Sequence, residues 1–231
     1  MSVDQQNGVI VDLVDVVKEY YLGTTVVPAV QGVSLTIRAG EFSTIAGPSG
    51  SGKTTLLNLI GCVDVATRGR VTVAGSETGA MKEKDLTRLR LFKIGFIFQS
   101  FNLVSVLTAY QNVEFPLLLQ KKVSKADRQK RVTELLDKVG LLDHQNHRPN
   151  ELSGGQRQRV AVARALVTKP QIVLADEPTA NLDSTTGNAI IDLMKHINEA
   201  EKTTFIFSTH DPKVMEHADR VIKLKDGRIV E

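Results

Sequence analysis

The sequence predicts an α/β fold whose core is a mostly parallel β-sheet. Three observations predict it. First, four short apolar runs, the pattern of strands buried on both faces, recur along the chain. Second, helical patterns separate these runs, and third, a glycine-rich loop directly follows the first of them. The four runs are residues 42–46, 94–98, 172–175 and 204–208.

Four helices are expected between these strands. The first, at residues 124–139, has Ser124 and Asp127 placed as in a capping box, and Gly140 follows its last turn. A shorter helical run follows the glycine-rich loop. The other expected helices are residues 55–60, about 154–167 and about 185–200.

The two ends of the chain and its middle follow other patterns. Residues 9–17 and 33–38 are rich in Val, Ile and Leu with partial alternation, which predicts antiparallel strands. Near the C-terminus, Asp226-Gly227 between two short apolar runs predicts a β-hairpin. From about residue 99 to 152 the pattern is helical, which predicts an inserted helical subdomain.

The composition is that of an ordinary soluble globular protein. Of 231 residues, 42% are hydrophobic and 24% charged. The net charge of +3 is slight, so nucleic acid is not an expected partner. The single cysteine, Cys62, excludes an internal disulfide, which suits a reducing compartment. The chain does not start as a signal peptide does, and it has no apolar run approaching the roughly 20 residues of a membrane-spanning helix. A membrane role is therefore expected to need a partner.

The glycine-rich loop matches the phosphate-binding pattern G-x-x-x-x-G-K-T. Glycines let main-chain N–H groups approach an anion, and the helix that follows adds its positive end. Lys53 is expected to contact the β- and γ-phosphates, and the Thr54 hydroxyl to ligate Mg²⁺. The nucleotide-binding residues expected here are Gly47, Pro48, Ser49, Gly50, Ser51, Gly52, Lys53, Thr54 and Thr55.

Two carboxylates, Asp176 and Glu177, end the apolar strand at residues 172–175. Asp176 can hold Mg²⁺ directly or through water, and Glu177 can orient or deprotonate the attacking water. The phosphate loop by itself leaves kinases, GTPases and many ATPases open, and this second pattern favours nucleotide hydrolysis.

The segment just upstream of that strand decides the family. It reads Leu152-Ser153-Gly154-Gly155-Gln156, and its serine and glycines precede a helix, so they form a second anion-binding helix start. With this LSGGQ signature the chain resembles ATP-binding cassette (ABC) proteins over essentially its whole length. The resemblance implies ATP and Mg²⁺ as cofactors, with Ser153, Gly154, Gly155 and Gln156 completing the ATP site of the opposite subunit in a head-to-tail homodimer.

The resemblance also implies the architecture. The fold would be a P-loop NTPase with a RecA-like core, an antiparallel β subdomain and an inserted α-helical subdomain. Residues 1–231 would form a single ABC ATPase domain. The core and β subdomain would take about 1–98 and 165–231, and the helical subdomain about 99–164.

Further residue roles are carried over from the family. Gln99 resembles the glutamine that reaches Mg²⁺ and water, Asp183 lies in a segment that crosses to the partner subunit, and His210 resembles the switch histidine at the γ-phosphate. Tyr20 resembles the aromatic residue that stacks on adenine, with the adjacent Tyr21 as the alternative. The catalytic residues implied are Lys53, Gln99, Glu177 and His210, and the Mg²⁺ ligands are Thr54, Gln99 and Asp176.

Three segments favour one branch of the family. Residues 61–64, 95–103 and 112–117 look like the lipoprotein-releasing and macrolide-export ATPases of the LolD and MacB type, and less closely like the division ATPase FtsE. That branch implies an integral membrane permease as partner, and a peripheral place on the cytoplasmic face of the inner membrane. Residues 100–113 would then either receive the permease or pack within the helical subdomain. The alternative functions are a soluble, non-transport ABC ATPase or an FtsE-like cell-division ATPase.

Overall fold

The structure is a computed structural model that describes residues 8–230. Its larger sheet has six strands in the order β10-β9-β3-β8-β7-β6, and all neighbours are parallel except β10 and β9. The predicted mostly parallel core is confirmed. The strands are β3 (Phe42–Ala46), β6 (Ile94–Ile97), β7 (Ile172–Asp176), β8 (Thr204–Thr209), β9 (Arg220–Lys225) and β10 (Arg228–Val230).

The predicted C-terminal hairpin is the β9–β10 pair. Asp226 (φ 48°) and Gly227 (φ 73°) both have the positive φ that a two-residue type I′ hairpin turn requires. However, β9 also pairs in parallel with β3, so the hairpin extends the core sheet and does not lie beside it.

A second sheet is wholly antiparallel, in the order β2-β1-β4-β5. The predicted strands at 9–17 and 33–38 pair as expected, but both continue to a turn at Gly23 (φ 62°). Sequence patterns did not predict the two shorter strands. The elements are β1 (Val9–Leu22), β2 (Thr25–Arg38), β4 (Arg68–Val73) and β5 (Ser76–Glu77).

All four expected helices are present. Ser124 caps α4 by accepting a hydrogen bond from the Asp127 main-chain N at 3.1 Å, and its hydroxyl donates to the Asp127 carboxylate at 2.7 Å. Gly140 (φ 70°) follows this helix, as predicted. The α-helices are α1 (Lys53–Ile60), α2 (Glu83–Lys93), α3 (Ala109–Leu119), α4 (Lys125–Lys138), α5 (Gly154–Leu166), α6 (Ser184–Glu201) and α7 (Pro212–Met215). Short 3₁₀ helices lie at Leu142–His144 and Pro149–Glu151.

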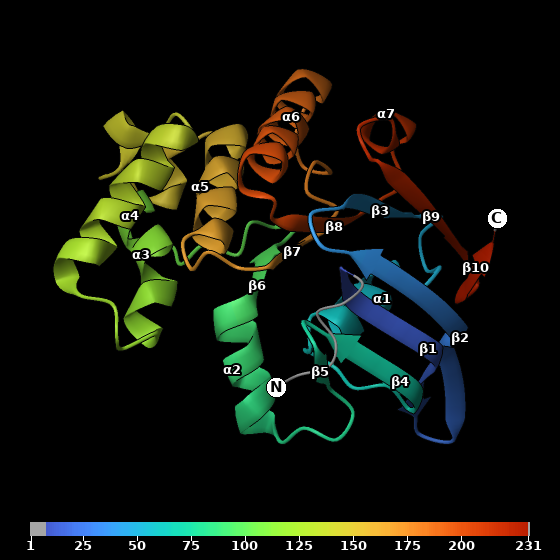
Figure 1. The fold of residues 1–231 in the computed structure, drawn as a ribbon. Helices are drawn as coiled ribbons and strands as arrows, with labels where there is room; N and C mark the ends of the chain where they lie inside the picture. Colours follow the sequence, from blue (N-terminus) through green and yellow to red (C-terminus); the bar gives the residue numbers. More distant parts are fainter. Residues whose placement is uncertain (1–7, 231) are drawn as a thin grey trace.

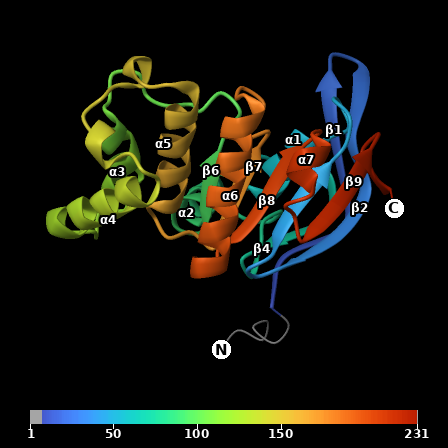
Figure 2. The same ribbon diagram turned by 90° about the horizontal axis from the view of Figure 1, so that it is seen from above.

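Each face of the parallel sheet has its own core. On one face α1 packs against the antiparallel sheet and the core strands, with Leu56 and Ile60 fully buried. On the other face α6 covers the tilted aromatic rings of Phe42, Phe205 and Phe207. Figures 1 and 2 place α3, α4 and α5 together on one side of the molecule and the antiparallel sheet on the other.

The helices α3, α4 and α5 share a third cluster of buried residues. Its members are aliphatic side chains spaced along the inward face of each helix, the pattern of an amphipathic bundle. Within residues 8–230, no helix has both the length and the apolar character needed to cross a membrane.

Candidate active site

The phosphate loop joins the end of β3 to the start of α1, and its glycines are required by close main-chain contacts. A Cβ on Gly47 would lie 2.1 Å from the Leu224 carbonyl oxygen. A Cβ on Gly52 would lie 2.3 Å from the Ala29 carbonyl oxygen, and Gly52 also has φ 100°. The neighbouring β2 and β9 therefore hold the loop so closely that only glycine fits at these two positions.

Replacing Gly52 by Ala is expected to destabilise the protein by about 3 kcal/mol or more, because it adds both a steric clash and an unfavourable φ. The matched control is Gly50→Ala in the same loop. Gly50 also has positive φ (77°), but no atom of residues 8–230 lies within 4 Å of its Cβ position, so only about 1 kcal/mol should be lost. Thermal unfolding of both variants measures the difference, and equal Tm values would contradict the steric account.

Lys53 lies under this loop with its side chain buried. Its Nζ donates to the carbonyl oxygens of Gly47 at 2.8 Å and Pro48 at 3.0 Å, and lies 3.8 Å from Glu177 Oε1. Main-chain oxygens of the loop thus hold the ammonium group in place. Phosphate oxygens can replace these carbonyls as its acceptors, because an ammonium binds phosphate as a point charge.

Thr54 at the start of α1 and Asp176 at the end of β7, the two residues expected to hold a cation, lie side by side. Thr54 Oγ1 lies 2.9 and 3.2 Å from the two carboxylate oxygens of Asp176. Ser208, from the adjacent β8, donates its hydroxyl to Asp176 at 2.5 Å and accepts from the Glu177 main-chain N at 2.9 Å. One serine therefore fixes both acidic residues, a role that sequence reasoning missed. The available signal was a hydroxyl residue at the end of the strand that neighbours β7.

Glu177 and His210 form a pair at the same edge of the sheet. His210 Nδ1 lies 2.9 and 3.0 Å from the two carboxylate oxygens of Glu177. To hydrogen-bond a carboxylate, this ring nitrogen carries the proton. Glu177 itself has φ 47°, a conformation that is rare for a residue with a side chain and that concentrates at functional sites.

These groups border a hollow of about 600 Å³. It is lined by most of the predicted phosphate loop together with Gln99, Glu177 and His210, so the fold brings these residues together. The lining also includes Val27, Pro28 and Ala29 of β2, which the sequence did not indicate because they lie in an exposed strand end. The predicted residues in the lining are Pro48, Ser49, Gly50, Gly52, Lys53, Thr54, Thr55, Gln99, Glu177 and His210.

The signature segment is not part of this lining. Ser153 is the exposed N-cap of α5, where it accepts from the Gln156 main-chain N at 3.2 Å while the Gln156 side chain accepts from the Ser153 N at 2.9 Å. A Cβ on Gly155 would lie 2.5 Å from Thr186 Cγ2, so glycine allows α5 to approach α6 closely. The helix start is thus fully formed but lies outside the chain's own hollow.

Asp183 is the N-cap of α6. Its carboxylate accepts from the Thr186 main-chain N at 3.0 Å and from the Thr186 hydroxyl at 2.7 Å. These hydrogen bonds lower the pKa of Asp183. Asp183 lies outside the hollow, as Ser153 does.

Tyr20 also lies outside the lining, near the exposed turn between β1 and β2. Its hydroxyl donates to Asp64 at 2.9 Å, and Lys18 Nζ lies 2.6 Å from the same carboxylate and 5.0 Å from the Tyr20 ring centre. Partial burial, together with Asp64, raises the pKa of Tyr20, and Thr55 opposes the shift. Thr55, the residue that opposes the shift, lines the hollow. Tyr21 is 66% exposed.

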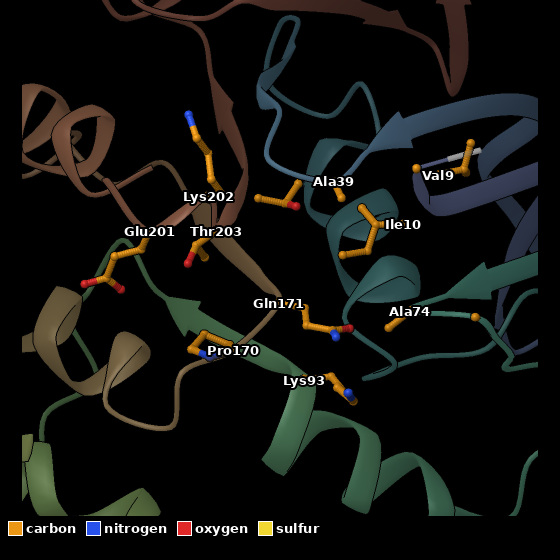
Figure 3. Close-up of a pocket in the computed structure, with 13 residues that line it drawn as sticks. Val9, Ile10, Ala39, Ala74, Lys93, Pro170, Gln171, Glu201, Lys202 and Thr203 are labelled. Atoms are coloured by element: carbon orange, nitrogen blue, oxygen red, sulfur yellow. The ribbon is translucent and has the colours of Figure 1, made fainter. Parts of the chain in front are cut away.

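A second hollow, of about 560 Å³, lies at the opposite end of the core sheet. Figure 3 shows Lys93, Gln171 and Thr203 at its wall, each just before a parallel strand begins. None of the predicted nucleotide-binding residues lines it. The hollow beside the phosphate loop lies at the carboxyl ends of the strands, where ligands bind in open α/β sheets.

Known proteins resemble this chain in sequence and in structure. The sequence profile described as ABC transporter matches residues 30–180. An uncharacterized ABC transporter ATP-binding protein of Methanocaldococcus jannaschii, MJ0796, is 47% identical over 222 residues, which cover 95% of this chain and 94% of that protein. The lipoprotein-releasing system ATP-binding protein LolD 1 of Rhodopseudomonas palustris is 46% identical over 213 residues, covering 92% and 94%. A dimeric, post-hydrolysis structure of MJ0796 bound to ADP and Pi matches with a TM-score of 0.89 at 46% identity, covering 96% of this chain and 97% of that one.

The fold and the site thus define a P-loop ATPase of the cassette type, as the sequence predicted. The chain belongs to the ABC transporter family, in which it is an ATP-binding, ATP-hydrolysing cassette with relatives of the LolD type.

Proposed function

We propose that this chain drives an integral membrane permease by hydrolysing Mg-ATP at two composite sites of a head-to-tail homodimer. One observation carries the proposal. The hollow is lined by the phosphate loop, Glu177 and His210, whereas the exposed helix start at Ser153 lies outside it. A second copy, turned head to tail, would supply Ser153, Gly154, Gly155 and Gln156 to the open side of each hollow. The dimeric assembly of the MJ0796 cassette supports this arrangement.

Mg²⁺ fits the residues at the end of β7. Thr54 Oγ1 and the Asp176 carboxylate already converge within 2.9 Å, and Gln99 lines the same hollow. Oxygen ligands in small number suit Mg²⁺, which keeps several waters and phosphate oxygens in its coordination shell. Bound there, it would neutralise charge that develops on the phosphates.

Glu177 is the proposed general base. Its carboxylate would take a proton from a water as the water oxygen attacks the γ-phosphorus in line with the bond to ADP, which then leaves. His210 holds the carboxylate through Nδ1, which leaves Nε2 on the outer side of the ring for the γ-phosphate. Lys53, freed from the Gly47 and Pro48 carbonyls, would stabilise the growing charge.

Tyr20 is the proposed adenine-stacking residue. Its ring is held in place by Asp64 and Lys18, whereas Tyr21 is far more exposed. Replacing Tyr20 by Ala should weaken ATP binding by about 1–3 kcal/mol, the usual contribution of base–aromatic stacking. Tyr21→Ala, one residue along, is the control and should bind ATP as the unmodified protein does. Calorimetric titration with ATP compares them, and a loss at Tyr21 alone would move the role to that residue.

The proposed permease partner would bind near α3. Large apolar side chains are exposed at the end of α2, in the segment between Gln99 and α3, and on α3 itself. Exposed apolar groups of this kind mark protein interaction surfaces. They are Phe92, Val104, Val106, Phe115, Leu118 and Leu119, with exposed fractions from 42% to 70%. Through this partner the chain would lie on the cytoplasmic face of the inner membrane. The LolD relatives favour lipoprotein release or a related export function.

The division into subdomains is part of the same proposal. A helical subdomain at about 99–164 is supported by the buried cluster that α3, α4 and α5 share. The remaining residues, about 1–98 and 165–231, would form the core and β subdomain.

Co-purification tests the partner class. Affinity-tagged chain, expressed in its own cell and extracted in mild detergent, should bring down an integral membrane protein. Val106→Asp places a charge on the most exposed of these side chains and should lower recovery while ATP hydrolysis by the purified chain is unchanged. Recovery with ribosomes or DNA would instead support a soluble, non-transport ATPase.

A further inference from the structure

The main chain just after Gln99 makes an unusual turn. Phe101 (φ 60°) and Asn102 (φ 48°) are consecutive residues in the left-handed region, although both carry side chains. Such a conformation persists only where neighbouring groups hold it. The groups that hold this turn therefore also set the position of Gln99, two residues upstream.

Two arginines of α5, the helix that begins in the LSGGQ signature, hold the turn at Phe101 and Asn102. Arg164 of α5 donates through Nη2 to the Phe101 carbonyl at 2.7 Å and through Nη1 to the Asn102 carbonyl at 2.5 Å. Arg157, seven residues earlier and so on the same face of α5, lies over the Phe101 ring at 5.1 Å. The flat, forked guanidinium of Arg164 is what lets one side chain bind both carbonyls.

Gln99 is held from another direction as well. Asn181, two residues before the α6 cap Asp183, donates to the Gln99 carbonyl at 2.9 Å. The helix α5 is itself joined to the segment after Glu177, because Gln158 Nε2 donates to the Pro178 carbonyl at 2.6 Å. The Gln99 main chain is thus connected to α5 and to the segment at residues 181–183. These are the two segments that the proposed dimer would bring against the partner's nucleotide.

We propose that Arg164 is a positioning residue that transmits the orientation of α5 to Gln99. When Ser153 at the start of α5 meets the nucleotide of the partner subunit, any rotation of α5 carries Arg164 with it. The two carbonyls bound to Arg164 then move Gln99 toward or away from its own Mg²⁺ and water. This inference rests on the proposed composite site. It adds a route by which nucleotide binding at one site changes the position of Gln99 at the other.

Replacing Arg164 by Lys tests the route, since Lys keeps the charge but cannot bind two carbonyls as a fork. We expect kcat to fall about 10-fold with the KM for ATP and the Tm unchanged, a size typical of residues that carry coupling. The control is Arg159→Lys. Arg159 lies on the same helix and donates to the Val139 carbonyl at 2.9 Å, a contact that leads to α4, so its kcat should stay unchanged.

A double-mutant cycle separates positioning from general stability. If Arg164 acts through Gln99, Arg164→Lys should have no further effect on kcat once Gln99 is replaced by Ala. Additive losses in the double variant, or an unchanged kcat in Arg164→Lys, would overturn the inference. If Arg164→Lys lowers the Tm, the same cycle is made with Arg157→Leu, which keeps an apolar contact with Phe101 but removes the cation. No hydrolysis by the unmodified chain would instead contradict the proposed function itself.

Discussion

Replacing Glu177 by Gln is expected to reduce ATP hydrolysis by about 10²- to 10⁴-fold, the usual contribution of a general base. Glutamine has nearly the same shape, and its amide oxygen can still accept from His210, which donates to Glu177 through Nδ1 at 2.9 Å. Only the ability to take a proton is lost. Phosphate release under saturating Mg-ATP measures the change.

The same variant should accumulate as an ATP-bound dimer, because in the proposed composite site the γ-phosphate of ATP holds the two chains together until it is cleaved. Size-exclusion chromatography with light scattering should find a dimer with ATP and a monomer with ADP. Glu83→Gln is the control, since Glu83 makes an exposed ion pair with Arg90 on α2, away from the hollow. A Glu177→Gln variant that hydrolyses ATP at the unmodified rate would remove Glu177 from its role.

Replacing Ser153 by Phe is expected to abolish ATP-driven dimerisation and to lower hydrolysis by about 10²-fold or more, the usual effect of losing donors at a developing charge. A large ring at the start of α5 would separate this helix from the partner's nucleotide. The chain's own hollow does not include Ser153, so a monomer should bind ATP with unchanged affinity. Calorimetry and light scattering, both in the Glu177→Gln background, measure the two properties separately.

The matched control is Ser124→Phe. Ser124 caps α4 as Ser153 caps α5, with hydrogen bonds of 3.1 and 3.2 Å to the main-chain N three residues on. Both substitutions remove one cap and should cost about 1 kcal/mol of stability. Only the Ser153 variant should lose dimerisation. Loss of ATP binding by the Ser153→Phe monomer would contradict the composite site.

Sequence patterns predicted the strands that are buried and the helices that begin at a capping residue. The four core strands are short, almost fully buried and mostly apolar, and α4, α5 and α6 begin at side-chain caps, so their bounds were predicted to within one residue or so. By contrast, α2 has no side-chain cap and buries only Leu86 and Leu89, and β4 begins with the exposed Arg68. These two elements were missed because they lack the caps and buried apolar runs by which a local sequence indicates a helix or a strand.

The candidate site was predicted as a set of residues but not as an arrangement. Glycine spacing predicted the phosphate loop, and the end of an apolar strand predicted the two acidic residues. The hydrogen bonds that join Ser208 to both of them, and the positive φ of Glu177, depend on strands that are distant in sequence. The same holds for the Ala29 carbonyl that excludes any side chain at Gly52.

Mixing two inactive variants tests the composite site most directly. Lys53→Ala disables a chain's own hollow and Ser153→Phe disables the helix start that it offers to its partner. In a head-to-tail dimer of the two, one site combines the intact Lys53 of one chain with the intact Ser153 of the other. The account predicts that an equimolar mixture hydrolyses ATP well above the rate of either variant alone. A mixture no more active than its components would contradict the claim that each site is built from two chains.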